Sequence, residues 1–441
     1  MNILILYNST QTYTNVVYEH LASFGHYSSH RFFYCHADPV SELNLDLKTF
    51  DAIGIHFSVR LPFNQISISV EKSLKDFDGL KFLFIQDEYD YTQRTWYWIR
   101  NLGIKLVFTA VPQASIETVY PNAEFPHTRF VTNLTGYAPA TLPPTQDLPP
   151  PSERTLMVGY RGRPLPIRYG QLGIEKISIG QIVKNYCDQY HIKNDIAWSE
   201  KARIYGSQWY DFIVSCRSML GSESGSNVFD WDGTLNKAIE KYCKENPKAS
   251  DDDVYIDIIR PIEIDGLINQ ISPKIFEAIA SRTVLVLFEG EYSGVIRPEE
   301  HFIALKKDGS NMEHVVSLLK NNPYIDAMTD RAWQDIILSG KYSYKSFLSM
   351  VDKEIELSFI DLPSRDMRFT EITTQIPTPI TMHPIRADPP RQSTDILIHT
   401  VLGSYDTKVF FIRLSIYVWL KLPESVKRCL KLGLKRLLGK V

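Results

Sequence analysis

Short runs of apolar residues, each about the length of one β-strand, most constrain the fold of this chain. Four such runs lie at residues 3–7, 52–56, 82–86 and 105–109, and another lies at 284–288. A strand that is apolar throughout is typical of a parallel sheet covered by helices on both faces. A helix is expected at residues 13–24, directly after the first run. Strands that alternate with helices predict an α/β fold with doubly wound parallel sheets.

The chain of 441 residues is long enough for two domains, and proline marks the boundary between them. Six of the thirteen residues from Pro139 to Pro151 are proline. Proline cannot donate a sheet hydrogen bond, so this stretch is expected to be an extended linker. The predicted organisation is an N-terminal domain at 1–138, a linker at 139–153, a second domain at 154–360, and a tail at 361–441 that joins an irregular proline-rich segment to a basic helix.

The segment from residue 271 to residue 305 contains a helix start that suits an anionic ligand. Ser272 is a favourable N-cap, and Pro273 fits the first helical position. Glu277 then lies about one turn into the helix. The N-terminus of this helix points toward a loop, where its unpaired N–H groups can bind an anion.

The same segment resembles the nucleotide-binding half of bacterial glycosyltransferases with two Rossmann-like domains (the GT-B type, group-one family), especially those that build surface polysaccharides. The resemblance rests on the pattern P-x-x-x-E-A-x-A at 273–280, the apolar run at 284–288, and a loop with the pattern H-x-I-x-L at 301–305. It implies two doubly wound domains facing a central cleft, a nucleotide-diphosphate sugar as donor, no cofactor, and a contact between Glu277 and the donor ribose. An ordinary amphipathic helix packed on a sheet is the alternative.

Cations after the first strand of the second domain are candidates for binding the donor diphosphate. Arg161 and Arg163 are separated by one glycine, and Lys176 follows thirteen residues later. Arginine and lysine neutralise phosphate charge, and the resembled family uses a Gly-Arg and a nearby Lys after this strand. The gap before Lys176 is longer than the usual one, and solvated surface cations are the alternative. Ser272 and Lys274 complete the predicted donor site.

A glycine-serine loop is a second candidate for donor contacts. Its members are Glu223, Ser224, Gly225 and Ser226. It follows an apolar segment at 212–216 that is expected to be a strand, and backbone N–H groups of such a loop can contact phosphate or sugar oxygens. The resembled family has two glutamates, and this chain has Asn269 in place of the first. Glu223 is therefore predicted to supply the catalytic carboxylate, with residues 227–268 as an insertion; a structural turn is the alternative.

Asp230 and Asp232 are separated by one residue, as in the metal-binding Asp-x-Asp of single-Rossmann glycosyltransferases. That architecture places the pair in its first domain, so an Asx turn is the favoured interpretation here. No metal is expected, because arginine and lysine side chains can neutralise a diphosphate.

Polar residues after the N-terminal strands are candidates for the acceptor side of the cleft. The first strand lacks a following G-x-G-x-x-G, so a dinucleotide is not indicated there. His56 and Arg60 follow the second apolar run, and Asp87 and Glu88 follow the third. Ligands of doubly wound sheets bind beyond the carboxyl ends of strands. We predict catalytic roles for His56 and Asp87 and acceptor binding by Arg60 and Glu88, with capped helix starts as the alternative.

The tail ends in a basic amphipathic pattern. Ser425 is a favourable N-cap. The apolar residues on one helical face after it are Val426, Leu430, Leu434, Leu437, Leu438 and Val441, and six lysines and arginines surround them. A helix of this kind lies at an anionic membrane surface, so residues 409–441 are expected to bind one. Docking of the tail on the N-terminal domain is the alternative.

Charge and cysteine content agree with a cytoplasmic enzyme. Lys and Arg number 48 and Asp and Glu number 51, so nucleic acid is not an expected partner. The five cysteines lack metal-type spacing, and the first residues do not form a signal peptide. The predicted protein is a cytoplasmic glycosyltransferase at the inner face of the cytoplasmic membrane. It transfers a sugar from a nucleotide-diphosphate sugar to a saccharide, expected to be lipid-linked, in surface polysaccharide biosynthesis.

The resemblance favours a retaining, metal-independent reaction, and two alternatives stay open. The pattern P-K-I-F-E-A at 273–278, followed by an apolar strand, also resembles the donor domain of inverting fucosyltransferases. Asn269, in place of an acid, is compatible with a catalytically silent partner in glycan assembly that has the same fold.

Overall fold

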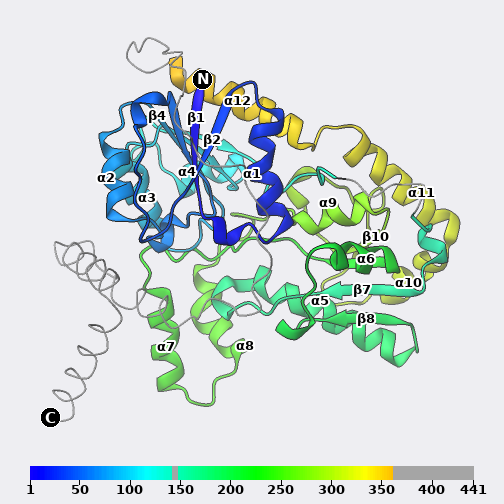
Figure 1. Ribbon diagram of the computed structural model, residues 1–441. Coiled ribbons are helices and arrows are strands. Elements are labelled where there is room, and N and C mark those ends of the chain that lie inside the picture. Colours follow the sequence, from blue (N-terminus) through cyan, green and yellow to red (C-terminus); the bar gives the residue numbers. More distant parts are fainter. Residues whose placement is uncertain (142–147, 361–441) are drawn as a thin grey trace, which may run out of the picture.

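Two parallel sheets confirm the doubly wound α/β fold expected from the sequence (Figure 1). The computed structural model describes residues 1–141 and 148–360. Part of the predicted linker and the whole predicted tail, including the membrane-binding segment 409–441, therefore lie outside the described residues. Among the helices of the two described ranges, none combines the length and the apolar content needed to cross a membrane.

The N-terminal sheet has six strands in the order β2-β1-β3-β4-β5-β6. The strands are β1 (Asn2–Tyr7), β2 (Arg31–His36), β3 (Ala52–Ile55), β4 (Leu80–Phe84), β5 (Leu106–Thr109) and β6 (Arg129–Thr132). β1 lies between β2 and β3 and is parallel to both. The winding direction reverses between β1 and β3, so the loops after these two strands flank the crevice where such sheets bind ligands.

Helices cover both faces of this sheet. On one face lie α1 (Asn15–Tyr27) and α12 (Tyr344–Ile360), and on the other lie α2 (Ile68–Asp76), α3 (Thr92–Leu102) and α4 (Ile116–Val119). Phe347 and Leu348 of α12 are buried in the same cluster as Ile3 and Phe24. The predicted second domain, 154–360, thus includes a last helix that packs on the first domain, beside α1 (Figure 1).

The second sheet has five strands in the order β11-β10-β9-β7-β8. They are β7 (Leu156–Arg161), β8 (Asn194–Ala197), β9 (Cys216–Gly221), β10 (Val284–Phe288) and β11 (Ile303–Leu305). One face is covered by α5 (Gly170–Gln189), α10 (Met312–Lys320) and α11 (Asn322–Ala332). The other is covered by α6 (Ser207–Ser215), α9 (Pro273–Ala280) and a π-helix (Trp333–Leu338). In this sheet the winding direction reverses between β7 and β9, so the ligand crevice is expected beside the loops after these two strands.

The expected strand at 212–216 is wrong, because most of this segment belongs to helix α6 and the strand β9 begins only at Cys216. Trp209, Phe212, Ile213 and Cys216 are all buried. Their spacing of three, one and three residues is that of a helix face, and the apolar run conceals this period. The glycine-serine loop nevertheless follows a strand, as expected, since β9 ends at Gly221.

The insertion at residues 227–268 leaves the second domain and packs on the first. Its helices α7 (Leu235–Glu245) and α8 (Asp251–Val254) project together from the molecule (Figure 1). Both ends of the insertion are anchored in the N-terminal core, where Phe229 is 5% exposed and Leu267 is 4% exposed. The backbone N–H of Asp230 donates to the Tyr89 carbonyl at 2.9 Å. The insertion therefore ties the two domains together.

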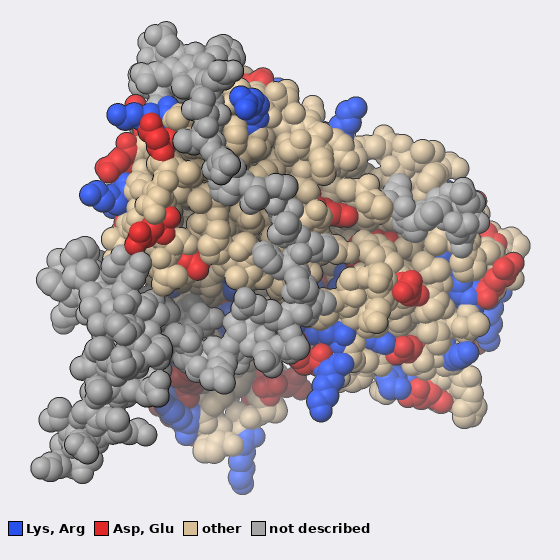
Figure 2. Space-filling model, viewed as in Figure 1, with Lys and Arg blue, Asp and Glu red and all other residues tan. Residues whose placement is uncertain are grey.

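Charged side chains are interspersed over the visible face of the molecule. Figure 2 shows Lys and Arg side chains next to Asp and Glu side chains around the rims of both domains. This mixing agrees with the formal net charge of −3 for the whole chain. Positive charge is concentrated instead in the cleft between the domains.

Candidate active site

A cavity of about 450 Å³ lies between the two domains, at the carboxyl ends of β7 and β9. The second domain lines most of it, through the loop after β7, the segment 203–209, the end of β9 and the start of α9. The N-terminal domain contributes residues 13–16, which join β1 to α1. The cavity therefore occupies the crevice that the topology of both sheets marks as a ligand site.

The cavity wall is strongly cationic. Of the described residues that line it, Glu277 alone is acidic, and the basic ones are Arg161, Arg163, Lys176, Arg203 and Lys274. Lys176 Nζ donates to Ser224 Oγ at 2.9 Å, and burial together with the nearby charge of Lys274 lowers the pKa of Lys176 to about 8. Cations held this close together repel one another, so an anionic ligand stabilises them.

Arg161 and Arg163, both predicted to bind the donor, differ in their contacts. The Arg161 guanidinium donates to Asp195 Oδ2 at 2.8 Å and lies 4.1 Å from the centre of the Phe212 ring. Arg163 forms no hydrogen bond or ion pair with any described residue, and it lines the cavity. Arg163 is therefore available to a ligand, whereas Arg161 is held within its own domain.

Glu277 lies on the first turns of α9 with its carboxyl group at the cavity. Trp209 Nε1 donates to Glu277 Oε2 at 2.7 Å, and the residue is 8% exposed. Burial raises the pKa of Glu277, while the Trp209 hydrogen bond and the charge of Lys274 oppose this rise. Ser272 and Lys274 line the cavity beside it, so the structure brings together the predicted residues of the 271–280 segment.

Replacing Glu277 with glutamine is expected to weaken donor binding roughly two- to tenfold. The amide keeps an oxygen for Trp209 but removes the charge from any hydrogen bond to a ligand hydroxyl, which costs about 0.5–1.5 kcal/mol. Titration calorimetry with any nucleotide sugar found to bind the wild-type protein measures the effect. Unchanged affinity would refute a ligand contact at Glu277.

A second cavity, of about 510 Å³, adjoins the first on the side of the N-terminal domain. Arg163 and Leu165 line both cavities. Asp87 lines the second cavity, accepts a hydrogen bond from Tyr89 Oη at 2.6 Å, and lies 3.9 Å from the Arg60 guanidinium. Its φ of 52° is in the left-handed region, a strained conformation that is concentrated at functional sites. Asp87 and Arg60 are therefore together on one wall, as predicted.

His56 and Glu88 lie behind this wall. His56 is fully buried, and its ring nitrogens contact Ser58 Oγ at 2.8 Å and His20 Nδ1 at 3.0 Å. Glu88 is fully buried too, accepts a hydrogen bond from the Ala110 N–H at 3.0 Å, and has a pKa that burial raises to about 7. Neither residue lines a described cavity, so the predicted direct roles in catalysis and acceptor binding do not fit their positions. Their strand-end location is right, but both side chains turn into the core.

Residues 223–226 of the glycine-serine loop line neither cavity, although the cavity-lining Lys176 donates to Ser224 Oγ. Glu223 Oε1 accepts hydrogen bonds from the N–H groups of Tyr292 at 2.8 Å and Glu291 at 3.2 Å, and Oε2 accepts one from Asn269. This carboxylate stabilises the loop after β10. Ser224 pairs with Gln270 through two backbone hydrogen bonds. In this structure the contacts of Glu223 are therefore with the protein's own loops, and its catalytic role stays a prediction.

Gly225 and Ser226 lie at the base of the insertion, and neither lines the two cavities. Gly225 has a φ of +100°, and a Cβ there would lie 2.2 Å from the Ile268 carbonyl oxygen. Ser226 is fully buried, with its hydroxyl 3.1 Å from the Val228 carbonyl. The favoured Asx-turn interpretation of the neighbouring acids fits, since Asp230 Oδ1 accepts the Gly233 N–H at 2.9 Å. No group of three or more metal-binding side chains occurs in the described part of the chain.

Several residues of the first cavity were missed by the sequence interpretation. They are Tyr13, Thr14, Asn15, Arg203, Tyr205, Trp209 and Ser222. Ser222 is next to the predicted loop, and residues 13–15 follow the first strand of a doubly wound sheet, so topology could have indicated both groups. No local sequence pattern marks Arg203, Tyr205 or Trp209 as cavity residues. They reach the cavity only through the folded arrangement of α6 and the segment before it.

No protein-family model matches this chain, and no curated protein matches it. Among solved structures it is similar to an alpha-glucosyltransferase in complex with UDP and a 13-mer DNA, with 10% identity and a TM-score of 0.47 over 80% of this chain and 99% of that one. It is also similar to AviGT4, a glycosyltransferase involved in avilamycin A biosynthesis, with 9% identity and a TM-score of 0.41 over 81% and 98%.

A third similar structure is the pneumococcal O-GlcNAc transferase GtfA in complex with UDP and GlcNAc. Its identity to this chain is 12%, its TM-score is 0.36, and the match covers 70% of this chain and 57% of that one.

Proposed function

We propose that this protein is a glycosyltransferase of the two-Rossmann-domain type that uses a nucleotide-diphosphate sugar as donor. The main observation in support of this proposal is the cationic cavity. It lies where the winding direction reverses in both sheets. Arg163, Lys176 and Lys274 neutralise the diphosphate, and the start of α9 adds the backbone N–H of Lys274. Glu277, the only described acid on this wall, accepts a hydroxyl hydrogen bond from the donor ribose.

The adjoining second cavity receives the saccharide acceptor. Aromatic rings of Phe57, Phe63, Tyr89 and Tyr169 line it, and such rings pack against the apolar faces of sugars. In the retaining reaction that we favour, the leaving diphosphate takes the acceptor proton while Arg163 stabilises the developing charge. In an inverting reaction Asp87 is the candidate base, because it reaches the cavity and His56 does not. The alternative of a catalytically silent partner keeps donor binding without turnover.

Screening nucleotide sugars by thermal shift tests this proposal. We expect one class, from a panel of UDP-, GDP-, dTDP- and CMP-linked sugars, to stabilise the protein by about 2.7 kcal/mol at a hundredfold excess over its Kd. Release of the nucleotide from that sugar then separates an enzyme from a silent partner. If no sugar of the panel stabilises the protein and none is turned over, the proposed function is contradicted.

The finer assignment is that the acceptor is lipid-linked and that the protein acts in surface polysaccharide biosynthesis at the cytoplasmic face of the membrane. Its support is the sequence pattern of the tail, where leucines and cations alternate on a helical period. An acceptor held in the membrane and an enzyme bound to the same membrane would meet on one surface.

Deleting residues 425–441 is expected to release the protein from anionic vesicles and to leave donor turnover nearly unchanged. The apolar residues supply insertion, the cations supply attraction to anionic lipid, and salt screens that attraction. Co-sedimentation with phosphatidylserine-containing vesicles measures the release, and neutral vesicles are the control. Undiminished binding of the truncated protein would contradict the membrane assignment.

A further inference from the structure

An ion pair joins the two domains beside the second cavity. Arg168, on the segment between β7 and α5, donates from Nη1 to Asp90 Oδ1 at 2.5 Å. Asp90 lies between β4 and α3 of the N-terminal domain. The Tyr169 hydroxyl accepts a hydrogen bond from Arg168 Nη2 at 2.5 Å and donates to Asp90 Oδ2 at 3.3 Å. Both oxygens of the Asp90 carboxylate are therefore bound by the second domain.

Both partners of this pair are largely shielded from water. The Asp90 side chain is 2% exposed and the Arg168 side chain is 15% exposed. Burial raises the pKa of Asp90, and the charge of Arg168 opposes this rise. Loss of Arg168 would leave the carboxylate buried without its counter-ion, which is a much larger penalty than the loss of an exposed ion pair. The contact therefore holds its two segments in a fixed relation.

Each of the two segments also carries a candidate residue of the transfer reaction. Arg163 precedes Arg168 by five residues and lines both cavities. Asp87 precedes Asp90 by three residues and lines the second cavity, and the Asp90 N–H donates to the Asp87 carbonyl at 3.1 Å. The ion pair is thus a short connection between the cation proposed for the donor and the acid on the acceptor side.

The segment that carries both arginines has little freedom to bend. Pro164 and Pro166 restrict their own φ angles, and both line the second cavity. Before them, the Gly162 N–H donates to the Ala197 carbonyl at 2.9 Å. A displacement at Arg168 is therefore expected to reach the cavity wall, because the segment cannot absorb it.

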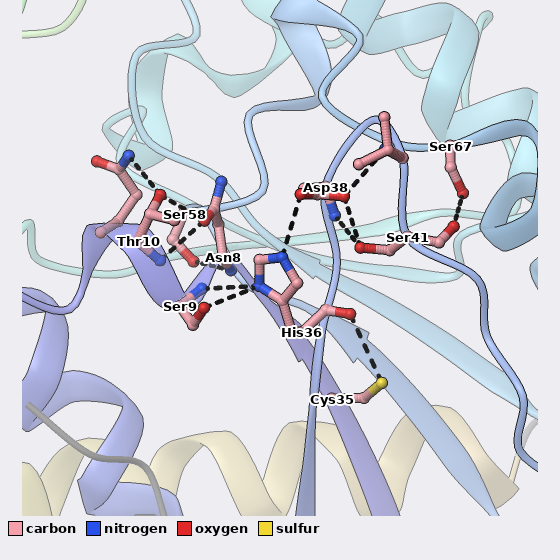
Figure 3. Close-up of polar contacts among 11 residues, drawn as sticks. Asn8, Ser9, Thr10, Cys35, His36, Asp38, Ser41, Ser58 and Ser67 are labelled. Carbon is pink, nitrogen blue, oxygen red and sulfur yellow. Dashed lines mark hydrogen bonds and ion pairs between the residues drawn. The ribbon is translucent and has the colours of Figure 1, made fainter. Parts of the chain in front are cut away.

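Another part of the second cavity wall is fixed by contacts inside the first domain (Figure 3). Ser58, which lines the cavity, accepts a hydrogen bond from the Asn8 N–H at 3.0 Å. The next residue, Ser9, donates its N–H to His36 Nδ1 at 3.1 Å. These residues follow or end β3, β1 and β2 of one sheet, so their contacts do not depend on how the domains meet. The position of residues 162–169 does depend on it, through the ion pair.

We propose that Asp90 and Arg168 are positioning residues that align the donor with the acceptor for transfer. The role rests on the proposed function, in which the donor occupies the first cavity and the acceptor the second. Misalignment of two bound reactants lowers the rate of their reaction more than it lowers the affinity for either one. Lys176 and Lys274 line the first cavity from helices α5 and α9, so the donor should still bind when the pair is broken.

The test compares Asp90→Asn, Arg168→Gln and the double variant with the wild-type protein. Each single change leaves the charge of the other partner behind, and the double change replaces the ion pair with two neutral amides that can hydrogen-bond. Asp330→Asn is the control, because it breaks an ion pair with Arg282 inside the second domain, where the Asp330 side chain is 55% exposed. Melting temperatures identify any variant that fails to fold.

Two readouts are needed, and the first uses no substrate. Hydrogen–deuterium exchange of residues 162–169 should rise in both single variants and rise less in the double variant, because no unpaired charge is then buried. The second compares transfer with donor hydrolysis, using the nucleotide sugar identified by the thermal-shift panel and p-nitrophenyl glycosides as acceptor probes. We expect the transfer kcat of the single variants to fall roughly 10- to 100-fold, while donor affinity and hydrolysis stay close to wild type.

Wild-type exchange in residues 162–169 of a folded Arg168→Gln variant would overturn the proposal. So would losses of transfer, donor affinity and melting temperature in equal proportion, because they would identify the pair as purely structural. Effects of the two single changes that simply multiply in the double variant would show that the residues do not act as a pair, and would overturn it too. Exchange is independent of turnover, so a protein that uses no nucleotide sugar would refute the proposed function, while the exchange result decides separately whether the pair holds the segment.

Discussion

Replacing Arg163 with alanine is expected to lower kcat/KM for the donor by roughly 10- to 100-fold while leaving the melting temperature almost unchanged. A charge-assisted hydrogen bond to phosphate contributes about 1.5–3 kcal/mol, which corresponds to this range. Arg163 forms no hydrogen bond or ion pair with a described residue and lines both cavities, so its removal breaks no such bond within the described residues. Steady-state kinetics and thermal unfolding of the same preparation measure the two effects.

Arg161→Ala is the matched control, two residues earlier in the sequence, at the end of β7. Its guanidinium donates to Asp195 and to two backbone carbonyls and lies over the Phe212 ring. We expect this variant to lose stability, with any loss of activity following the loss of fold. If the two variants lose melting temperature and activity in the same proportion, Arg163 is a structural residue and the diphosphate assignment fails.

The central strands of both sheets could be predicted because a buried parallel strand is apolar at every position. The run at 284–288 is β10 to the residue, and the run at 52–56 differs from β3 only at its last residue. Edge strands were missed for the same physical reason. β2 is partly exposed along its length, and β11, which lies within the H-x-I-x-L pattern expected to be a loop, has only three residues. Their side chains do not form a continuous apolar run.

The candidate site shows the same difference: positions set by local sequence could be predicted, and positions set by contacts between distant segments could not. Glu277 and Arg163 reach the first cavity because each is placed by a helix or strand end next to it in the sequence. The contacts of Glu223 could not be predicted, because its partners, Glu291, Tyr292 and Asn269, come from distant segments that no local pattern brings together. The burial of His56 could not be predicted either, because the sequence places it at a strand end but does not show that its side chain packs against His20 and Phe57.

Replacing Phe229 with alanine is expected to destabilise the protein by about 3–5 kcal/mol, the usual cost of removing a buried phenylalanine side chain. Phe229 belongs in sequence to the donor domain but lies in the core of the other domain, within contact of the Tyr89 and Trp231 rings. Urea unfolding followed by tryptophan fluorescence measures the change in the free energy of unfolding. Hydrogen exchange in α3 of the N-terminal domain should rise as well, because the insertion packs on that helix through Trp231 and Trp96.

Ile256→Ala is the control within the same insertion. Ile256 is 62% exposed, so its removal should change the free energy of unfolding by no more than about 0.5 kcal/mol. Equal stabilities of the two variants would mean that the insertion is not anchored at Phe229. Backbone hydrogen bonds also join the insertion to residues 89–93, beside the second cavity. If that cavity receives the acceptor as proposed, loosening the insertion in Phe229→Ala should alter acceptor KM before it alters donor KM.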